Sequence, residues 1–360
     1  MTATDLFRLT GRPIVIGTGL LALDIVFSAD DAMAPQFYAG GTCGNVLVIL
    51  SYLGWKSYPV ARLNEDAASG YVVKDLKRWA VQLDWAMTKP SCNTPIVVQR
   101  IKRNTDGKVS HHFKWTCPTC GAWLPGYAAI HARAAQAIIE APKKPNVFFF
   151  DRVSRGAITL AKASAENGAL VVFEPSSVGD TRLFQEAISY ASVLKYSYER
   201  MPNVHGLCST NRPLLEVQTL GPDGVRYRYH LPNQELKEWI TIPAPHSSAI
   251  RDTAGAGDWF TAGIIQCLGQ NGCDGLHSAT REQILDALRF AQALSVWSCA
   301  FEGARGGMYL VDKKSFRANV REALSGREVV IVTSQRRQGR ALHSWKCLSP
   351  YCGAKRAKDV

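Results

Sequence analysis

Residues 251–258 combine residue types that suit phosphoryl transfer, because they read Arg-Asp-Thr-Ala-Gly-Ala-Gly-Asp. The Gly-Ala-Gly step at 255–257 has little or no side chain, so its backbone can approach a ligand closely. The apolar run at 259–265 predicts a helix, and the free N–H groups and positive dipole at a helix start suit an anion. Asp258 falls in the first helical turn, placed to take a proton from a hydroxyl that attacks a phosphorus held there.

An ordinary glycine-rich turn followed by an acidic residue is the alternative interpretation, since carboxylates are favoured in the first turn of any helix. A glycine-rich loop alone would not decide between the two. Here a two-glycine turn, a carboxylate and an apolar helix occur together. We therefore predict Asp258 as general base and the amides of Gly255, Ala256 and Gly257 as an anion hole.

Short apolar runs alternate with helical stretches along the chain, and these elements must position the motif. Strands are predicted at residues 14–16, 95–101, 109–115, 146–150, 170–173, 192–194 and 214–220. Helices are predicted at 46–53, 66–83, 128–141, 155–167, 281–298 and after Gly257. Near-continuous apolar strands separated by helices indicate an α/β protein, with a mostly parallel central sheet flanked by helices on both faces.

The sequence Asp-Thr-Ala-Gly-Ala-Gly-Asp at 252–258 resembles the second signature of the ribokinase (PfkB) family of sugar and nucleoside kinases. The resemblance covers about residues 12–312. Gly-Leu-Leu-Ala-Leu-Asp at 19–24 looks like the family's first-strand motif. Gly-Gly-Thr-Cys-Gly-Asn at 40–45, followed by Leu-Gly at 53–54, looks like its first signature. The resemblance implies a ribokinase-like fold with a small β lid, and an ATP- and Mg²⁺-dependent carbohydrate kinase with Asp258 as its base.

Further site residues follow from the resemblance and from position in the sequence. To the acceptor we assign Asp24, Gly40, Gly41, Asn45 and Asn93. To the nucleotide we assign Lys195, Thr219, Gly221, Gly224, Gly303 and Ala304. Each has a structural alternative: Asp24 could end a strand, Asn45 could cap a helix, Lys195 could be solvated, and residues 219–224 could form a plain hairpin turn.

Three positions depart from the family pattern. Where the family carries Asn-x-x-Glu, this chain has Ser197 and a single carboxylate, Glu199, which we assign to Mg²⁺ through water. Glu174-Pro175 stands where the family has Asp-Pro or Asp-Asn, and a glycine usual before Asp66 is absent. These changes leave the base and anion hole in place, but they weaken any specific substrate assignment and leave an altered or reduced activity open.

The predicted hairpin at 95–115, together with residues 24–38, occupies the place of the family's lid. A lid that closes over the acceptor would exclude water from the reaction. Ordinary hairpin packing is an equal alternative. The predicted domains are a kinase domain at 1–326, with its lid at about 24–40 and 93–116, and an extension at 327–360.

Two cysteine pairs lie outside the kinase pattern: Cys117-Pro-Thr-Cys120 and Cys347-Leu-Ser-Pro-Tyr-Cys352, each followed by glycine. The first resembles a zinc knuckle, and a structural zinc site needs four ligands. We predict that Cys117, Cys120, Cys347 and Cys352 bind one Zn²⁺ and fold the basic C-terminal extension onto the lid region. A redox-active Cys-x-x-Cys, or two unrelated thiol pairs, are the alternatives.

The composition is globular, since 46% of the 360 residues are hydrophobic and 20% are charged. The 42 Lys and Arg against 30 Asp and Glu give a net charge of +12, which favours anionic partners. The apolar stretch at 14–27 contains Asp24 and is too short to span a bilayer. With no secretory signal pattern, we expect a cytoplasmic protein without a membrane partner.

Other functions stay open at this stage. A nucleoside kinase is the nearest rival within the enzyme class. The second rival is a non-catalytic module that senses a sugar or nucleotide. Its basic zinc-containing tail would bind a protein or nucleic acid, of which nucleic acid is the less favoured partner. Family lids often pair, which leaves a homodimer open, and the resemblance also implies a monovalent cation near Asp252.

Overall fold

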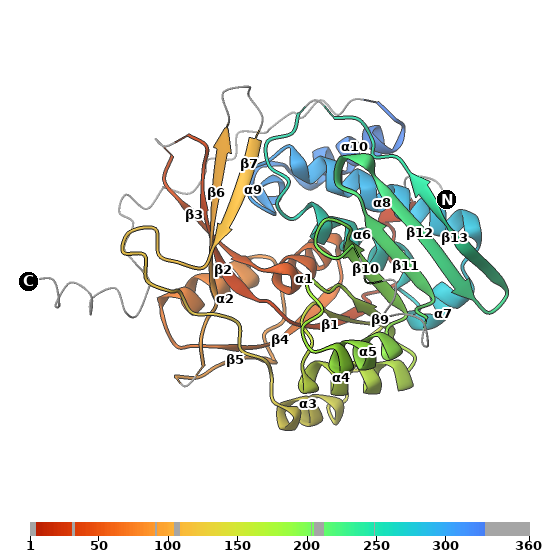
Figure 1. Ribbon diagram of the computed structural model, residues 1–360, viewed down its shortest axis with the longest axis horizontal. Coiled ribbons are helices and arrows are strands. Elements are labelled where there is room, and N and C mark those ends of the chain that lie inside the picture. Colours follow the sequence, from red (N-terminus) through yellow and green to blue (C-terminus); the bar gives the residue numbers. More distant parts are fainter. Residues whose placement is uncertain are drawn as a thin grey trace, which may run out of the picture.

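The computed structural model describes residues 5–30, 33–90, 92–103, 109–202, 204, 212–247 and 249–327. A large twisted sheet lies between two layers of helices, and a smaller sheet stands apart at one end of the large one (Figure 1). The mostly parallel α/β architecture predicted from the alternating pattern is confirmed.

The large sheet has nine strands in the order β13-β12-β11-β10-β9-β8-β1-β4-β5. Their bounds are β1 Ile14–Thr18, β4 Lys56–Leu63, β5 Ala86–Thr88, β8 Val147–Phe150, β9 Leu170–Phe173, β10 Val193–Ser197, β11 Leu215–Thr219, β12 Val225–Leu231 and β13 Gln234–Ile242. Neighbours from β5 to β11 pair in parallel, and β12 and β13 add an antiparallel edge. Strands β4, β5, β12 and β13 were not among the predicted strands.

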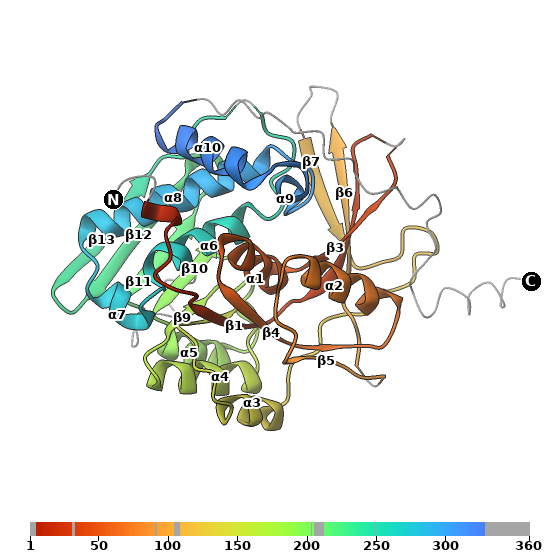
Figure 2. The same cartoon turned by 180° about the vertical axis from the view of Figure 1, so that it is seen from behind.

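Helices cover both faces of this sheet (Figures 1 and 2). The helices that the structure describes are α1 Thr42–Leu53, α2 Ala67–Arg78, α3 Ala132–Ile139, α4 Arg155–Glu166, α5 Thr181–Tyr190, α6 Ala256–Leu268, α7 Gly272–His277, α8 Arg281–Cys299, α9 Gly306–Leu310 and α10 Lys313–Leu324, with 3₁₀ turns at Asp5–Phe7 and Gly221–Asp223. Phe148 and Phe150 pack with residues of α3, α4 and α5, whereas Phe149 packs with residues of α1, α6 and α8. Strand β8 is therefore buried on both faces, which explains its continuous apolar run.

The smaller sheet contains the two segments predicted for the lid. Its strands are β2 Ala22–Phe27, β3 Gln36–Gly40, β6 Ile96–Arg103 and β7 Val109–Lys114, in the order β3-β2-β6-β7. The hairpin predicted at 95–115 is confirmed as β6–β7, and β2 pairs with β6 in parallel, with Asp24 opposite Val97. Asp24 thus lies inside β2, and the alternative that it ends a strand is wrong.

Two predicted helices are shorter than expected. The helix predicted at 66–83 ends at Arg78, because Ala80 adopts a positive φ of 58° that a right-handed helix cannot contain. The helix predicted at 128–141 begins only at Ala132, since His131 is extended with ψ of 149°. In the part of the chain that the structure describes, no helix is long and apolar enough to cross a membrane.

Gly41 provides a test of the turn that connects β3 to α1. Its φ is 76°, and a Cβ built on it would lie 2.4 Å from the carbonyl oxygen of Leu20. We expect Gly41→Ala to lower the free energy of unfolding by at least about 2 kcal/mol, because left-handed backbone and a backbone collision add together.

Gly70 is the matched control, because it lies within α2 with no positive φ and no atom within 4 Å of the place that a Cβ would take. Gly70→Ala should raise the free energy of unfolding by about 0.5–1 kcal/mol in urea titrations. Equal effects of the two substitutions would contradict this account of Gly41.

Candidate active site

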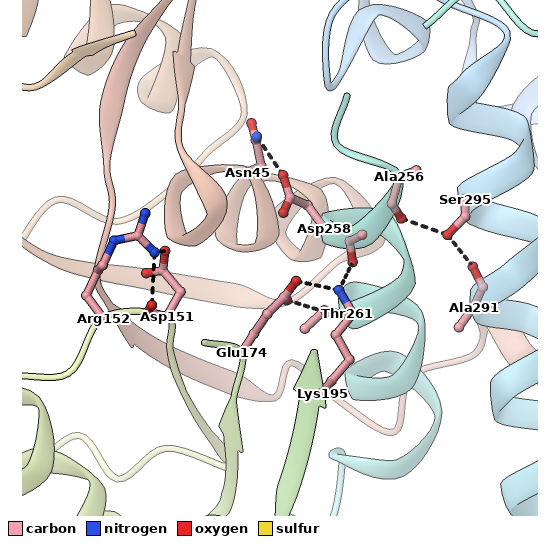
Figure 3. A network of polar contacts seen from close by, with 11 residues as sticks. Asn45, Asp151, Arg152, Glu174, Lys195, Ala256, Asp258, Thr261, Ala291 and Ser295 are labelled. Atoms are coloured by element: carbon pink, nitrogen blue, oxygen red, sulfur yellow. Dashed lines mark hydrogen bonds and ion pairs between the residues drawn. The ribbon is translucent and has the colours of Figure 1, made fainter. Parts of the chain in front are cut away.

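The chemically capable side chains lie where the parallel strands end. Asp151 follows β8 and Glu174 follows β9. Glu174 lies beside the N-terminal end of α6, whereas Asp151 pairs with Arg152 and lies farther from that helix (Figure 3). Ligands of open α/β sheets bind at this carboxyl edge. Asp258 is the third residue of α6 and is buried, with 8% of its surface exposed.

Asn45 and Asp258 point toward each other from α1 and α6 (Figure 3). Nδ2 of Asn45 donates to Oδ2 of Asp258 at 2.7 Å. The alternative that Asn45 caps a helix is wrong, because α1 begins at Thr42 and its N-cap residue is Gly41. The first signature therefore places an amide directly on the predicted base.

Burial raises the pKa of Asp258 well above its usual value, and the nearby carboxylate of Glu174 raises it further. The hydrogen bond from Asn45 and the charge of Lys195 act in the opposite direction. A carboxylate with a raised pKa holds a proton more readily than a solvated one, which is the property a general base near neutral pH needs.

The predicted anion hole forms the start of α6. Gly255 is the N-cap residue with φ of 76°, and a Cβ there would lie 2.5 Å from that of Ala304. Only glycine fits this position. The amides of Gly257 and Asp258 stand in the first turn, where the helix itself offers no preceding carbonyl to accept from them. Anions bind such N-termini.

A largely buried ion pair, with side chains 4% and 12% exposed, supports the same turn. Nζ of Lys195 pairs with Glu174 and donates to the carbonyl oxygen of Gly257 at 3.2 Å (Figure 3). Glu174 also accepts from the hydroxyl of Thr261. Lys195 is 3% exposed, so the alternative of a solvated lysine is wrong. A Cβ on Gly257 would lie 2.9 Å from this Nζ, so the glycine makes room for the lysine.

Two carboxylates were missing from the predicted site, that of buried Asp151 and that of partly buried Glu174. Glu174 stands out in the sequence only as a departure from the family pattern, although its place directly after a buried strand could have marked it. Asp151 accepts from the amide of Leu20 at 2.9 Å and pairs with Arg152, and burial raises its pKa to about 6. A Cβ built on Gly19 would collide with the Asp151 carboxylate, so the turn from β1 into the lid depends on this glycine.

The acceptor residues predicted on the lid side converge, with one exception. The carboxyl group of Asp24 packs against Gly40 and accepts from the amide of Gly41. Burial raises the pKa of Asp24 to about 7, although the charge of Arg305 opposes that shift. Asn93 is exposed on the segment before β6, so the structure does not bring it into this buried group.

Asp252 links the lid to the anion hole. Its Oδ2 accepts from Nε2 of Gln99 on β6 at 2.6 Å and from the amide of Gly303 at 2.8 Å. Its Oδ1 accepts from the amide of Ala254 at 3.0 Å and lies 3.1 Å from Nδ1 of His111 on β7. Both oxygens of the carboxylate thus contact the protein. The monovalent cation that the resemblance implies near Asp252 stays a prediction.

The residues assigned to the nucleotide lie in two places. Thr219, Gly221 and Gly224 form the turn between β11 and β12, so the predicted turn is present, and the carbonyl oxygen of Thr219 accepts from the amide of Tyr198 after β10. Gly303 and Ala304 pack instead around the start of α6: the amide of Gly303 donates to Asp252 in the preceding loop, and the carbonyl oxygen of Ala304 accepts from the indole of Trp259 in α6 at 3.0 Å. Their contacts with a nucleotide stay predictions.

Glu199, assigned to Mg²⁺, is exposed in the turn after β10. In the described ranges, no group of three or more His, Cys, Asp or Glu residues could hold a metal ion. An exposed carboxylate still fits magnesium, because Mg²⁺ keeps several waters and binds through one or two carboxylates together with substrate phosphates.

The first half of the predicted zinc site has the tight turn expected of a knuckle. Cys117 is buried, its carbonyl oxygen accepts from the amide of Gly121 at 2.9 Å, and its Sγ accepts from the amide of Thr119 at 3.4 Å. Cys347 and Cys352 lie outside the described residues, as does the extension from 328 onward. The four-thiolate site stays a prediction.

Comparisons with known proteins agree with this architecture. No protein-family model matches the sequence. The chain is 24% identical over 325 residues to probable fructokinase-6, chloroplastic, from Arabidopsis thaliana, covering 81% of this chain and 79% of the relative.

Two solved structures have a similar fold. Fructokinase from Xylella fastidiosa with bound ATP is 18% identical, with a TM-score of 0.62 over 81% of this chain and 93% of its own. Ribokinase from Arabidopsis thaliana with ribose and ATP is 18% identical, with a TM-score of 0.60 over 87% and 99%. The chain has the ribokinase-like fold, and the resemblance to the PfkB family predicted from its motifs is confirmed.

The burial of Asp258 predicts a pH-dependent cost to stability. Its folded-state pKa is raised, so its stabilising contribution is present below the unfolded pKa and is lost as pH rises toward the folded pKa. We expect Asp258→Asn to raise the melting temperature at pH 7–8 by about 2 °C or more, with no gain near pH 4. Asp274→Asn, at a side chain that is 96% exposed, is the control. A melting temperature lowered equally at every pH would contradict this assignment.

Proposed function

We propose that this protein is an ATP-dependent carbohydrate kinase that phosphorylates a hydroxyl of a sugar or sugar-like acceptor. The observation that carries the proposal is the buried Asp258 carboxylate, held by Asn45 at the N-terminal end of α6 beside the amides of Gly255, Ala256 and Gly257. The names of the structural relatives, which include fructokinase and ribokinase, support the same reaction class.

The residues have distinct parts in the proposed reaction. Asp258 accepts the proton of the acceptor hydroxyl while that oxygen forms its bond to the γ-phosphorus. The bond between the γ-phosphorus and the bridging oxygen breaks, and ADP leaves with those electrons. The amides at the start of α6 bind the oxygens of the transferred group. Mg²⁺, when bound with the nucleotide, neutralises phosphate charge, and Glu199 would hold it through water.

On the lid side, Asp24 and the Gly40–Gly41 turn form the proposed acceptor pocket. With a pKa raised to about 7, the Asp24 carboxyl group can accept or donate a hydrogen bond to a sugar hydroxyl near neutral pH. Lid contacts to Asp252 from β6 and β7 place the small sheet over the loop before α6. Exclusion of water there would favour transfer to the acceptor over hydrolysis.

Two aromatic contacts hold rings of the lid. Phe37 stacks on Tyr71 with ring centroids 4.9 Å apart, and Tyr38 packs on Tyr309 at 4.6 Å. Each of these rings is engaged on one side by another protein ring, and the lid also carries Phe113 on β7, which is 45% exposed, so both a sugar and a nucleoside stay open as acceptors. A sensing module would not need a buried base beside an anion-binding helix start.

A coupled assay of ADP release against a panel of sugars and nucleosides tests the proposal. We expect turnover with at least one sugar, and Asp258→Asn should lower kcat by about 10²–10⁴-fold because the general base is lost. Nucleotide affinity should change little, since the backbone amides remain.

The exposed Asp274→Asn variant is again the matched control and should keep its activity. Equal turnover by wild type and Asp258→Asn would refute the role of the base. Activity with nucleosides alone would favour the rival kinase. Salt-sensitive nucleic-acid binding without ATP consumption would favour the sensing module.

We also propose the structural zinc site of Cys117, Cys120, Cys347 and Cys352. Metal analysis of the purified chain should find about one equivalent of Zn²⁺, as four thiolates bind one ion. Cys347→Ser should lower that content, whereas Cys267→Ser, at a thiol of α6 that packs against the main core, should not. Zinc below about a third of an equivalent, unaffected by Cys347→Ser, would refute the site.

A further inference from the structure

Arg305 is a buried arginine at the start of α9, and no part of the predicted site included it. Its side chain is 1% exposed. Nε donates to Oδ1 of Asn45 at 3.0 Å, and Nη2 donates to Oδ2 of Asp75 at 2.8 Å and to the carbonyl oxygen of Ala39. One guanidinium thus joins α1, α2 and β3 directly behind the proposed base.

The contact with Asn45 decides which way its amide faces. Asn45 presents one acceptor end and one donor end, and its donor end reaches Asp258 at 2.7 Å. Arginine has only donors, so the Asn45 oxygen must face Arg305 and the Asn45 nitrogen must face Asp258. The reversed amide would place N–H groups against the guanidinium and an oxygen against a carboxylate.

The position of Arg305 is itself fixed from its far side. Asp75 accepts from the amide of Ala39 at 2.9 Å and from the hydroxyl of Tyr309. The indole of Trp79 lies 3.2 Å from that hydroxyl. Asp75 therefore balances the charge of Arg305 while leaving its Nε directed at Asn45.

We propose that Arg305 is a positioning residue for the general base, which locks the Asn45 amide in the orientation that donates a hydrogen bond to Asp258. The proposal rests on the proposed kinase function and adds to it a residue that touches neither phosphate nor base. Without Arg305, the Asn45 amide is free to turn, and the hydrogen bond that favours the charged form of Asp258 is weakened.

A purely structural ion pair between Arg305 and Asp75 would have a different consequence. It would lower stability without moving the protonation of Asp258. The charges of Glu174, Lys195 and Arg200 act on the pKa of Asp258. The charge of Asp258 in turn raises the pKa of the Cys43 thiol on α1. Asn45 bonds to both Arg305 and Asp258, so the effect of Arg305 on Asp258 should pass through Asn45. The charge of Arg305 also lowers the pKa of Asp24, so the experiment needs a readout that reports Asp258 alone.

The experiment measures kcat/KM against pH in wild type and in Arg305→Met. We expect the acidic limb of the profile to move up by about one pH unit, the size expected when a hydrogen bond to a charged group is lost. Asn45→Leu should produce the same shift. In the Asn45→Leu background, Arg305→Met should add no further shift, because the amide is already gone.

If the acidic limb of the kcat/KM profile does not move in Arg305→Met, the proposal is wrong. A further shift in the Asn45→Leu background would also overturn it if the melting-temperature gain from Asp258→Asn shows the same shift, since a through-space effect of the charge on Asp258 would then be responsible. Tyr309→Phe is the control, because it loosens Asp75 and should lower stability without moving the limb. If Arg305→Met does not fold, the double variant Arg305→Met/Asp75→Leu is measured in its place, because it removes both buried charges together.

A second readout does not require activity. The gain in melting temperature from Asp258→Asn grows with pH until the pH passes the folded-state pKa of Asp258, and then stays constant. In the Arg305→Met background, this constant value should be reached about one pH unit higher than in wild type. If wild type transfers phosphate to no acceptor, the proposed function fails, and this difference alone judges the role of Arg305. If the gain becomes constant at the same pH in both backgrounds, Arg305 does not position the Asn45 amide.

Discussion

The burial of one carboxylate, that of Asp258, is the constraint on which the site depends. A charged group away from water is costly unless hydrogen bonds and opposite charges compensate it. Asn45 supplies the hydrogen bond and Lys195 the charge, while Glu174 pairs with the lysine. Because these groups come from α1, β10 and the end of β9, the base is in place only when helices and sheet are packed together.

The lid is tied to the same region through Asp252 rather than through the base. Gln99 and His111 reach this residue from β6 and β7, and the amide of Gly303 reaches it from the segment before α9. The loop that opens α6 is thus held by the small sheet and by the segment that carries Arg305. Lid position and anion-hole geometry are therefore linked through contacts within one loop.

The local features of this site could be predicted from the sequence, whereas its long-range contacts could not. The glycines at 255 and 257 and the apolar run after them identify α6, since turn chemistry and helical period are local properties. Strand β4 was missed because Pro59 interrupts its pattern. The contact between Gln99 and Asp252 joins residues 153 positions apart, and only the packed fold brings them together.

A crystal structure with ADP, aluminium fluoride and the acceptor identified by the panel would test the central claim most directly. We expect the acceptor oxygen within about 2.6–3.2 Å of the Asp258 carboxylate, with Asn45 still bound to the same carboxylate. We also expect the fluoride group on the amides at the start of α6. An Asp258 side chain turned away from the acceptor, or an anion bound elsewhere, would contradict the role of this carboxylate as the base.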